Sequence, residues 1–583
     1  MYRYLYLLIL SFAFPVFSGA QTNIKVVHAE AEAVLLGNFN PDDYAQADPV
    51  FDPSLIAEML TSEISADSLK SYLEQMRGFG NRNTGSDTLS TTFGMGAARR
   101  WAFDKFESFS LQSENRLLVS YLQFDLPVGT MNQHRNIIAV LPGQGPQYQE
   151  VVLVEGHFDS RCEDVNDIEC LAEGMEDNGS GSALVLELAR VMSKFSYNRT
   201  IVFVLTTGEE QGLLGAEAFS TWFKDSDAEL MAVFNNDIVG GIICGATASP
   251  PGCPGLNDID STNVRIYSQG TFNSRNKQLA RFTKLEYQEM AELYMTVPMI
   301  INILSPEDRT GRGGDHIPFR EKGFPAIRFT SANEHGDGNP SQANYEDRQH
   351  SMEDVLGVDT DGDMILDSFF VDFNYLARNT IINGNAIAMA ALGPVAPTNF
   401  NVVPVNNGFE VSFDDSNAYG VYRIGVRTPA TNDWDTVYTI YNTLDTIFGL
   451  MPDQVYDLSA ATVDDNGVES LFSNEKFSAF TTGTFELPWA EQGLTLLQNH
   501  PNPFDDATVI GVQVDRQIDY KEAWIVVHDL TGRELAKMPI SLTVGRNEVA
   551  YDFQNHEYVP GVYAYSLIID GAFVESRQMI YAY

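Results

Sequence analysis

Three clusters of acidic and histidine residues in this sequence each follow directly after an apolar run. The clusters are Gly156-His157-Phe158-Asp159-Ser160 after residues 151–154, Gly208-Glu209-Glu210 after residues 201–205, and Asn235-Asn236-Asp237 after residues 231–234. A continuous apolar run of this length is typical of a buried parallel strand. Ligand sites in open α/β sheets lie just beyond the carboxyl ends of the strands. We therefore expect the polar side chains of the three clusters to meet at one edge of one sheet.

These residue types can bind two divalent cations that lie close together. His157 is a natural metal ligand, and Asp159 can orient its imidazole through a hydrogen bond. In the adjacent pair Glu209 and Glu210, one carboxylate can bind metal while the other takes a proton from water. Asp237 can supply a further ligand. The pattern predicts a two-metal hydrolase.

Two further motifs can complete this site. Asp177, in Glu176-Asp177-Asn178-Gly179-Ser180-Gly181, precedes an expected helix and could bridge both cations. A second histidine is needed, and His350, in Gln349-His350-Ser351-Met352-Glu353-Asp354, is the preferred candidate over His316. The glycine-rich segment lacks the Gly-Lys-Ser/Thr of a phosphate loop and the G-x-S-x-G of a serine hydrolase.

Alternating strands and helices must position these residues. Expected strands at 151–155, 201–206 and 231–235 alternate with expected helices at 179–193 and 212–223, which favours a parallel sheet covered by helices. Further expected helices are 65–77, 95–106 and 369–391, and further expected strands are 117–124, 136–141 and 324–329. The predicted fold class is α/β, with a mostly parallel mixed sheet flanked by helices and followed by two small β-sandwich modules.

The 583 residues divide into five segments by composition. Residues 1–20 have the basic, apolar and small-residue regions of a signal peptide, and the apolar run is shorter than the roughly 20 residues of a membrane anchor. Residues 21–52 form an N-terminal extension or propeptide, and residues 53–393 the α/β domain. Short alternating runs predict a β-sandwich over 397–482 and a second β module over 494–583.

Charge and cysteine usage restrict the partners. The net charge is −43, from 79 acidic and 36 basic residues spread along the chain, which argues against a nucleic-acid partner. No transmembrane segment is expected. Export permits disulfides, and the four cysteines form two close pairs, Cys162 with Cys170 and Cys244 with Cys253.

An acidic loop carries Asp359, Asp361, Asp363 and Asp367 around Gly362. Carboxylates at alternate positions around a glycine can bind Ca²⁺. The loop lacks the closing glutamate of an EF-hand, so an acidic surface turn is the alternative.

The order His-x-Asp, Glu-Asp-Asn-Gly-Ser-Gly, Gly-Glu-Glu-x-Gly, Asn-Asp and His-Ser-x-x-Asp resembles the secreted di-zinc aminopeptidase family over about residues 55–392. That family also includes glutamate carboxypeptidases, glutaminyl cyclases and transferrin receptors. The resemblance implies a zinc exopeptidase fold, two Zn²⁺ per chain and release of N-terminal residues from peptides by a metal-bridging water. It implies the following roles: His157 and Glu210 as terminal ligands on different metals, Asp177 as the bridge, Asp237 and His350 as the remaining ligands, Glu209 as the general base and Asp159 as a supporting catalytic residue.

Residues 494–583 resemble the C-terminal sorting domain of the type IX secretion system. The residues that carry this resemblance are 497–504 (Leu-Gln-Asn-His-Pro-Asn-Pro-Phe), 529–533 (Asp-Leu-Thr-Gly-Arg) and 561–563 (Gly-Val-Tyr). The resemblance implies that the type IX machinery is a partner and that the protein passes through the periplasm to the surface or surroundings of a gram-negative bacterium. Residues 397–482 resemble a fibronectin type III module.

Three alternatives stay open. A glutaminyl cyclase would share the fold but keep one zinc. A carboxypeptidase of the same fold would need basic residues for the substrate carboxylate, and Arg309 and Arg312 lie close to Asp315 in the sequence. A catalytically dead receptor-like or adhesive ectodomain is the third, and the intact Glu209 and five ligands argue against it.

Overall fold

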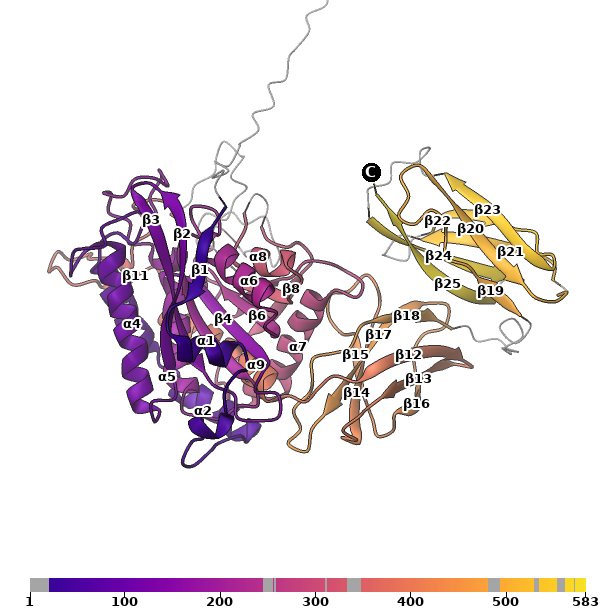
Figure 1. Ribbon diagram of the computed structural model, residues 1–583, viewed down its shortest axis with the longest axis horizontal. Coiled ribbons are helices and arrows are strands. Elements are labelled where there is room, and N and C mark those ends of the chain that lie inside the picture. Colours follow the sequence, from indigo (N-terminus) through magenta and orange to yellow (C-terminus); the bar gives the residue numbers. More distant parts are fainter. Residues whose placement is uncertain are drawn as a thin grey trace, which may run out of the picture.

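The computed structural model describes residues 20–244, 255, 258–309, 312–332, 348–480, 493–518, 520–528, 534–552, 561–570 and 572–582. Figure 1 shows an α/β domain in indigo to magenta, an orange β module and a yellow β module. The predicted signal peptide up to residue 19, Cys253 and the sorting motif at 529–533 lie outside the described residues.

A nine-stranded mixed sheet forms the centre of the α/β domain, in the order β1-β2-β3-β5-β4-β6-β9-β7-β8. The strands are β1 (Thr22–Val26), β2 (Leu118–Val128), β3 (Met131–Leu141), β4 (Val151–His157), β5 (Thr200–Thr206), β6 (Leu230–Asn236), β7 (Asn263–Tyr267), β8 (Ile300–Leu304) and β9 (Ala326–Ser331). The four central strands β5, β4, β6 and β9 are parallel, and so are β7 and β8. The other neighbours pair antiparallel.

Helices cover both faces of this sheet because its central strands are apolar on both sides. Val152 and Val154 of β4 pack in a core with α2, α3, α4, α5, α7 and α9, whereas Val151 and Leu153 pack in a second core with α1, α6 and α8. The helices are α1 (Ala29–Leu35), α2 (Pro53–Glu63), α3 (Ala66–Arg77), α4 (Gly94–Gln112), α5 (Ser180–Met192), α6 (Leu214–Ser226), α7 (Arg275–Glu289), α8 (His316–Glu321) and α9 (Phe373–Leu392), with short turns η1 (Pro41–Tyr44), η2 (Met175–Gly179) and η3 (Ala291–Tyr294). Among the described residues, no helix combines the length and hydrophobicity of a membrane span.

The N-terminal segment is part of the α/β domain. Strand β1 pairs antiparallel with β2 at the edge of the sheet, and Val34 and Leu35 of α1 are completely buried in the second core. Strand β1 and helix α1 therefore pack as part of the α/β domain, and removal of residues 21–52 as a propeptide stays a prediction. A five-residue edge strand carries no periodicity of its own, so only its pairing with β2 reveals it.

The two C-terminal modules each contain a three-stranded and a four-stranded antiparallel sheet. The first module has β12 (Thr398–Val405), β13 (Gly408–Asp414) and β16 (Leu444–Phe448) in one sheet and β15 (Thr436–Ile440), β14 (Val421–Arg427), β17 (Val455–Val463) and β18 (Lys476–Ala479) in the other. The second has β19 (Leu494–Leu496), β20 (Ala507–Val514) and β23 (Gly545–Asp552), then β22 (Glu534–Pro539), β21 (Ala523–His528), β24 (Gly561–Ile569) and β25 (Ala572–Tyr581). One hydrophobic core joins the two sheets of each module.

A buried ion-pair network joins the first module to α7. The Glu475 carboxylate accepts hydrogen bonds from Arg281 of α7 at 2.8 Å and from Arg427 of β14 at 2.7 Å. Arg427 also pairs with Asp457 at 2.7 Å. Lys277, one turn before Arg281, is fully buried and donates to the Ser268 hydroxyl. The module is thus fastened to the α/β domain by charges that solvent does not reach.

Candidate metal centre

Strands β4, β5 and β6 deliver three of the predicted clusters to the same edge of the sheet. His157 is the last residue of β4 and lies opposite Thr206, the last residue of β5, in the parallel register. Asp237 follows directly after β6. Gly208, with a left-handed φ of 75°, turns the chain from β5 towards Glu209.

A close approach between glycines brings α5 to this edge. A Cβ atom on Gly156 would lie 2.8 Å from the carbonyl carbon of Gly181, so a side chain there would push the start of the helix away from β4. The Asn178 side chain accepts the N–H groups of Gly181 and Ile238 and donates to the Asn236 carbonyl. These contacts hold the turn that carries Asp177.

Asp177 lies between the two candidate histidines. Its Oδ1 is 3.0 Å from Nε2 of His157, and its Oδ2 is 3.1 Å from Nε2 of His350. Asp237 Oδ1 is 3.5 Å from Nε2 of His157, and Glu210 Oε2 is 3.4 Å from Nε2 of His350. The five side chains therefore form two donor sets that share one carboxylate: the His157 set (His157, Asp177, Asp237) and the His350 set (His350, Asp177, Glu210).

The donor sets fit two divalent cations. Asp237 Oδ1 and Glu210 Oε1 are buried and receive no hydrogen bond. A buried carboxylate oxygen without a donor is costly, and a bound cation removes that cost. Histidine nitrogen and carboxylate oxygen are ordinary zinc donors. The residues present are thus suited to two zinc ions.

The pKa values of the clustered carboxylates also favour a bound cation. Burial raises the pKa of Glu209 and of Glu210 well above their ordinary values, and nearby carboxylates add to the shift. Burial also acts to raise the pKa of Asp177, but its hydrogen bonds with His157 and His350 outweigh this and hold the pKa well below its usual range. Negative charge is therefore concentrated on the shared carboxylate, where a cation would stabilise it.

Glu209 lies beside the His157 set without a hydrogen-bond partner for its carboxylate among the described residues. One of its carboxylate oxygens is within 4.8 Å of donor atoms of His157 and Asp237. A carboxylate in this position can reach a water held by the donor sets. Glu209 thus has the place that a general base requires.

Sequence comparison identifies the family of this site. The model of peptidase family M28 matches residues 136–243. A probable zinc metalloprotease of Leptosphaeria maculans is 30% identical over 393 residues, which cover 65% of this chain and 87% of the relative. The chain belongs to peptidase family M28. It is therefore a zinc metallopeptidase, and its substrates are peptides.

The chain is also similar to a second fungal protein and to two solved structures. A probable zinc metalloprotease of Pyrenophora tritici-repentis is 28% identical over 427 residues, or 70% of this chain and 92% of the relative. The solved structure of the LapA aminopeptidase of Legionella pneumophila is 18% identical, with a TM-score of 0.41 over 57% of this chain and 74% of that one. Glutaminyl cyclase of Porphyromonas gingivalis is also 18% identical, with a TM-score of 0.38 over 55% and 97% of the two chains.

Asp159 contacts the M28 site in a different way from the one that its spacing suggested. The Nδ1 atom of His157 is 3.1 Å from the main-chain carbonyl of Asp159, whereas the Asp159 carboxylate is 3.7 Å away. That carboxylate instead accepts the main-chain N–H groups of Glu209 and Glu210, each at 3.2 Å. We expected the Asp159 carboxylate to orient His157, but its two oxygens accept the N–H groups of Glu209 and Glu210.

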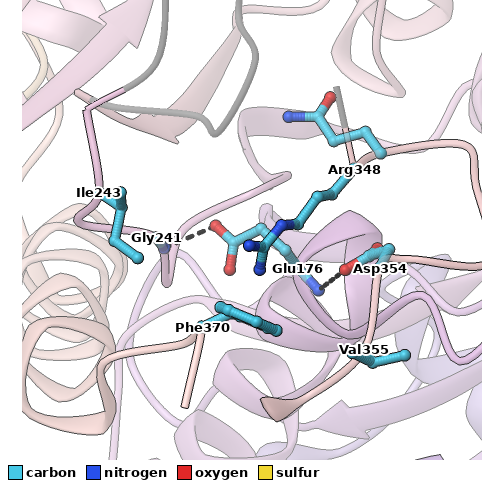
Figure 2. Close-up of a pocket in the computed structure, with 8 residues that line it drawn as sticks. Glu176, Gly241, Ile243, Arg348, Asp354, Val355 and Phe370 are labelled. Atoms are coloured by element: carbon cyan, nitrogen blue, oxygen red, sulfur yellow. Dashed lines mark hydrogen bonds between the residues drawn. The ribbon is translucent and has the colours of Figure 1, made fainter. Parts of the chain in front are cut away.

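Asp354 supports the shared ligand. Its two oxygens accept the N–H groups of Glu176 and Asp177 at 2.9 and 3.0 Å. Figure 2 shows Asp354 beside Glu176, whose own carboxylate accepts the N–H of Gly241. The pocket between them and Phe370 has a volume of about 30 Å³, which suits a water molecule or two and not a peptide side chain.

Two buried arginines complete the support, and the sequence analysis missed both. Arg82 donates to the carbonyls of Phe158, Glu173 and Gly174 and so ties the His157 loop to the Asp177 turn. Arg328 in β9 lies 3.0 Å from Asp237 and 2.6 Å from Asp308. For Arg328 the available signal was an arginine inside an apolar strand, because a buried guanidinium needs carboxylate partners. Arg82 lies in a turn-rich loop and gave no such signal.

The other residues considered from the sequence, His316, Arg309 and Arg312, differ in whether they contact the donor sets. His316 is buried in α8, its Nε2 lies 2.9 Å from the Glu307 carbonyl, and it belongs to neither donor set. Burial lowers its pKa to about 4. Arg312 lies 3.2 Å from Nδ1 of His350, whereas Arg309 is buried beside Asp308 at 3.5 Å. Of the two arginines considered for a carboxypeptidase, Arg312 is therefore the one in contact with the site.

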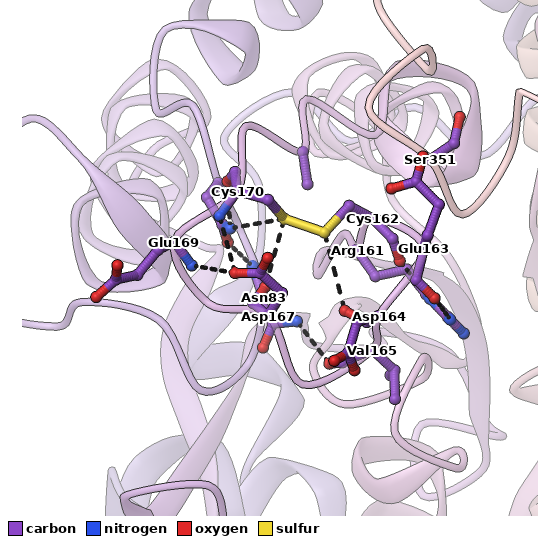
Figure 3. The surroundings of a disulfide bond; sticks show 12 residues. Asn83, Arg161, Cys162, Glu163, Asp164, Val165, Asp167, Glu169, Cys170 and Ser351 are labelled. Atoms are coloured by element: carbon purple, nitrogen blue, oxygen red, sulfur yellow. Dashed lines mark hydrogen bonds between the residues drawn. A yellow bond between two sulfur atoms is a disulfide. The ribbon is translucent and has the colours of Figure 1, made fainter.

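One of the two predicted disulfides is present. Cys162 and Cys170 are bonded, with an S–S distance of 2.12 Å (Figure 3). Cys244 is buried, and because Cys253 lies outside the described residues their pairing stays a prediction.

The acidic loop lies on the surface between β10 (Gly357–Val358) and β11 (Ser368–Phe369). Oxygens of Asp359, Asp361 and Asp367 lie within 4.8 Å of one another. Asp363, the fourth acid, accepts the N–H of Ile365, and Asp359 accepts those of Gly362 and Met364. The loop can form these turns by itself, so calcium binding stays a prediction.

Proposed function

We propose that this M28 peptidase binds two zinc ions and releases the N-terminal residue of peptides. The observation that carries the proposal is Asp177, which directs one oxygen to His157 and the other to His350. A shared carboxylate between two histidine-carboxylate sets is the arrangement that a two-metal hydrolase needs.

The chain's own residues account for the rest of the chemistry. Zinc in such a site supplies a Lewis acid and a nucleophilic water near neutral pH. Glu209 takes the proton of that water and passes it to the leaving amine. The Asp159 carboxylate holds the backbone of Glu209 and Glu210 in place, and the burial of His157, Asp177 and Asp237 keeps bulk water from the His157 set.

The glutaminyl cyclase alternative is less well supported, because one zinc would leave one donor set unused. The carboxypeptidase alternative has one observation in its favour, the position of Arg312 beside His350. N-terminal specificity itself rests on the resemblance of the five motifs to the di-zinc aminopeptidases.

Export belongs to the same proposal. The signal-like residues 1–20 and the sorting motifs of residues 494–583 support secretion by the type IX machinery to the cell surface or surroundings of a gram-negative bacterium. Expression in a bacterium with and without that machinery, followed by assay of the medium, would test this part independently.

The first experiment measures zinc content and hydrolysis on one purified sample of the chain. Two zinc ions per chain, cleavage of aminoacyl-p-nitroanilides, loss with a chelator and recovery with zinc are the expected results. Cleavage of N-acetylated peptides at their C-terminus would favour the carboxypeptidase. One zinc ion with cyclisation of N-terminal glutamine would favour the cyclase.

A further inference from the structure

The disulfide loop presents an arginine to the metal centre. Arg161 comes two residues after Asp159 and directly before Cys162. Its Nε donates to the Cys162 carbonyl at 3.0 Å and its Nη2 to the Glu163 carbonyl at 2.9 Å. Figure 3 shows Arg161 within this loop, next to the disulfide. The two hydrogen bonds to its own loop hold the guanidinium in one orientation.

The loop itself is anchored to the α/β domain on both sides of the disulfide. Asn83 donates to the Val165 carbonyl at 3.0 Å, and Asn81 donates to the Cys170 carbonyl at 2.7 Å. A side chain on a stapled and anchored loop loses little conformational entropy when it binds a ligand. Arg161 is thus preorganised for binding.

The third nitrogen of Arg161 points at the His350 set. Nη1 is 3.9 Å from Glu210 Oε2, too far for a hydrogen bond, and 20% of the side chain is exposed. Arg312 lies on the same side, 3.2 Å from His350. Two guanidinium groups therefore flank the His350 set.

The anion nearest to the Arg161 guanidinium is Glu210, which is itself one of the candidate metal ligands. The His350 set is built to bind a cation, and a guanidinium about 4 Å from one of its ligands repels that cation. The chain as a whole carries a net charge of −43, so its long-range field repels anionic substrates. A carboxylate that is to bind here needs a local cation, and the planar fork of arginine matches a carboxylate.

We propose that Arg161 binds a carboxylate of the peptide substrate close to the scissile bond. The inference rests on the proposed exopeptidase function and names a substrate class for it. The carboxylate is either an acidic side chain or the free C-terminus of a short peptide, and both present the same chemistry to the guanidinium.

Matched substrates separate the two sources. Glutamyl- against glutaminyl-p-nitroanilide tests an acidic first residue, Ala-Asp-amide against Ala-Asn-amide tests an acidic second residue, and Ala-Ala against Ala-Ala-amide tests the C-terminus. We expect the wild type to prefer the charged member of at least one pair. In Arg161→Gln the ratio of kcat/KM for the charged member to kcat/KM for the neutral member should fall roughly tenfold, because a charged hydrogen bond to the substrate is lost. Arg161→Lys should keep part of the preference.

Arg135→Gln is the matched control, because Arg135 lies in β3 and its guanidinium donates to the side chains of Gln123 and Gln133. Arg135→Gln should leave the ratio of kcat/KM between the charged and neutral members of each substrate pair unchanged. Equal losses on all substrates in Arg161→Gln would overturn the proposal, since Arg161 would then act on Glu210 or on the reacting atoms. A wild type without any charge preference, or a preference that survives Arg161→Gln, would overturn it as well.

Binding measurements keep the test independent of turnover. The same peptides with a reduced, non-hydrolysable bond are titrated by calorimetry against wild type and Arg161→Gln. Tighter binding of the charged member, by roughly tenfold in the wild type and absent in the variant, supports the proposal even if no peptide is hydrolysed. Failure of the proposed function would appear separately, as loss of zinc or of all hydrolysis.

Discussion

Asp159 and Glu209 are joined through the main chain: the Asp159 carboxylate accepts the N–H of Glu209 at 3.2 Å, and its other oxygen accepts the N–H of Glu210 at the same distance. Asp159 is completely buried. One carboxylate on the β4 loop thereby sets the position of both Glu209 and Glu210 on the β5 loop.

Asp159→Asn should lower kcat about 10- to 100-fold, because an amide turns one acceptor into a donor that faces an N–H group. Zinc content should change little. Steady-state kinetics and metal analysis on the same sample check this. Asp164→Asn, in the same disulfide loop but exposed, is the control and should behave as wild type. Full activity in Asp159→Asn would remove this residue from the positioning role.

Glu209→Gln should keep the fold and both zinc ions but lose about 10²- to 10⁴-fold in kcat, because glutamine cannot accept a proton. Steady-state kinetics and metal analysis of the same sample measure kcat and zinc content. Glu217→Gln, on α6 and paired with Lys322, is the control. Retained turnover in Glu209→Gln would assign the base to another residue.

His350→Ala should weaken zinc retention, whereas His316→Ala should not, because only His350 faces Asp177 and Glu210. Dialysis against a graded chelator followed by metal analysis compares the two. His316→Ala is expected to lower the melting temperature instead, since it removes a buried side chain. The opposite pattern of zinc loss would show that the wrong histidine was placed in the site.

Arg328→Met should destabilise the α/β domain by about 3–5 kcal/mol, because the carboxylates of Asp237 and Asp308 would stay buried without their partner. Chemical denaturation of the metal-free chain measures this. The double variant Arg328→Met/Asp308→Asn should recover part of the loss, since one of the two charges is then removed. Equal free energies of unfolding for the single and double variants would show that the Asp308 carboxylate does not destabilise the domain when Arg328 is removed.

Lys277 should make stability depend on pH. Burial lowers its pKa from 10.5 to about 7, and the charges of Arg281 and Arg427 contribute. Between these two pKa values the unfolded chain binds a proton that the folded chain does not, so stability rises with pH. Relative to Lys277→Met, the wild type should gain about 4 kcal/mol in the free energy of unfolding from neutral to strongly alkaline pH. Chemical denaturation at a series of pH values measures the free energy of unfolding of both proteins. The same dependence on pH in the wild type and in Lys277→Met would contradict this prediction.

The central strands and their ligands could be predicted from sequence because each strand is a long apolar run that ends at a polar cluster. The expected strands at 151–155, 201–206 and 231–235 correspond to β4, β5 and β6, and each boundary is within two residues of its counterpart. Side chains that follow parallel strands must meet at one edge, so their order along the chain was sufficient information.

Other elements could not be predicted in this way. Helix α7 carries Lys277, Arg281 and Glu286 on positions that are buried against neighbouring parts of the fold, so its apolar pattern is weak. Strand β1 lies at a sheet edge and takes its stability from β2. In both cases tertiary contacts outweigh the local pattern.

The sequence by itself determined the class of chemistry, since only its residue types and their order are needed to select a zinc peptidase site. The tertiary structure decided which groups meet. His350 and not His316 faces Asp177, the Asp159 carboxylate accepts two N–H groups and leaves His157 to its main-chain carbonyl, and Arg161 lies beside Glu210. The reason is physical. Neighbours along a strand have a fixed spacing, whereas contacts between distant loops exist only after the chain has packed.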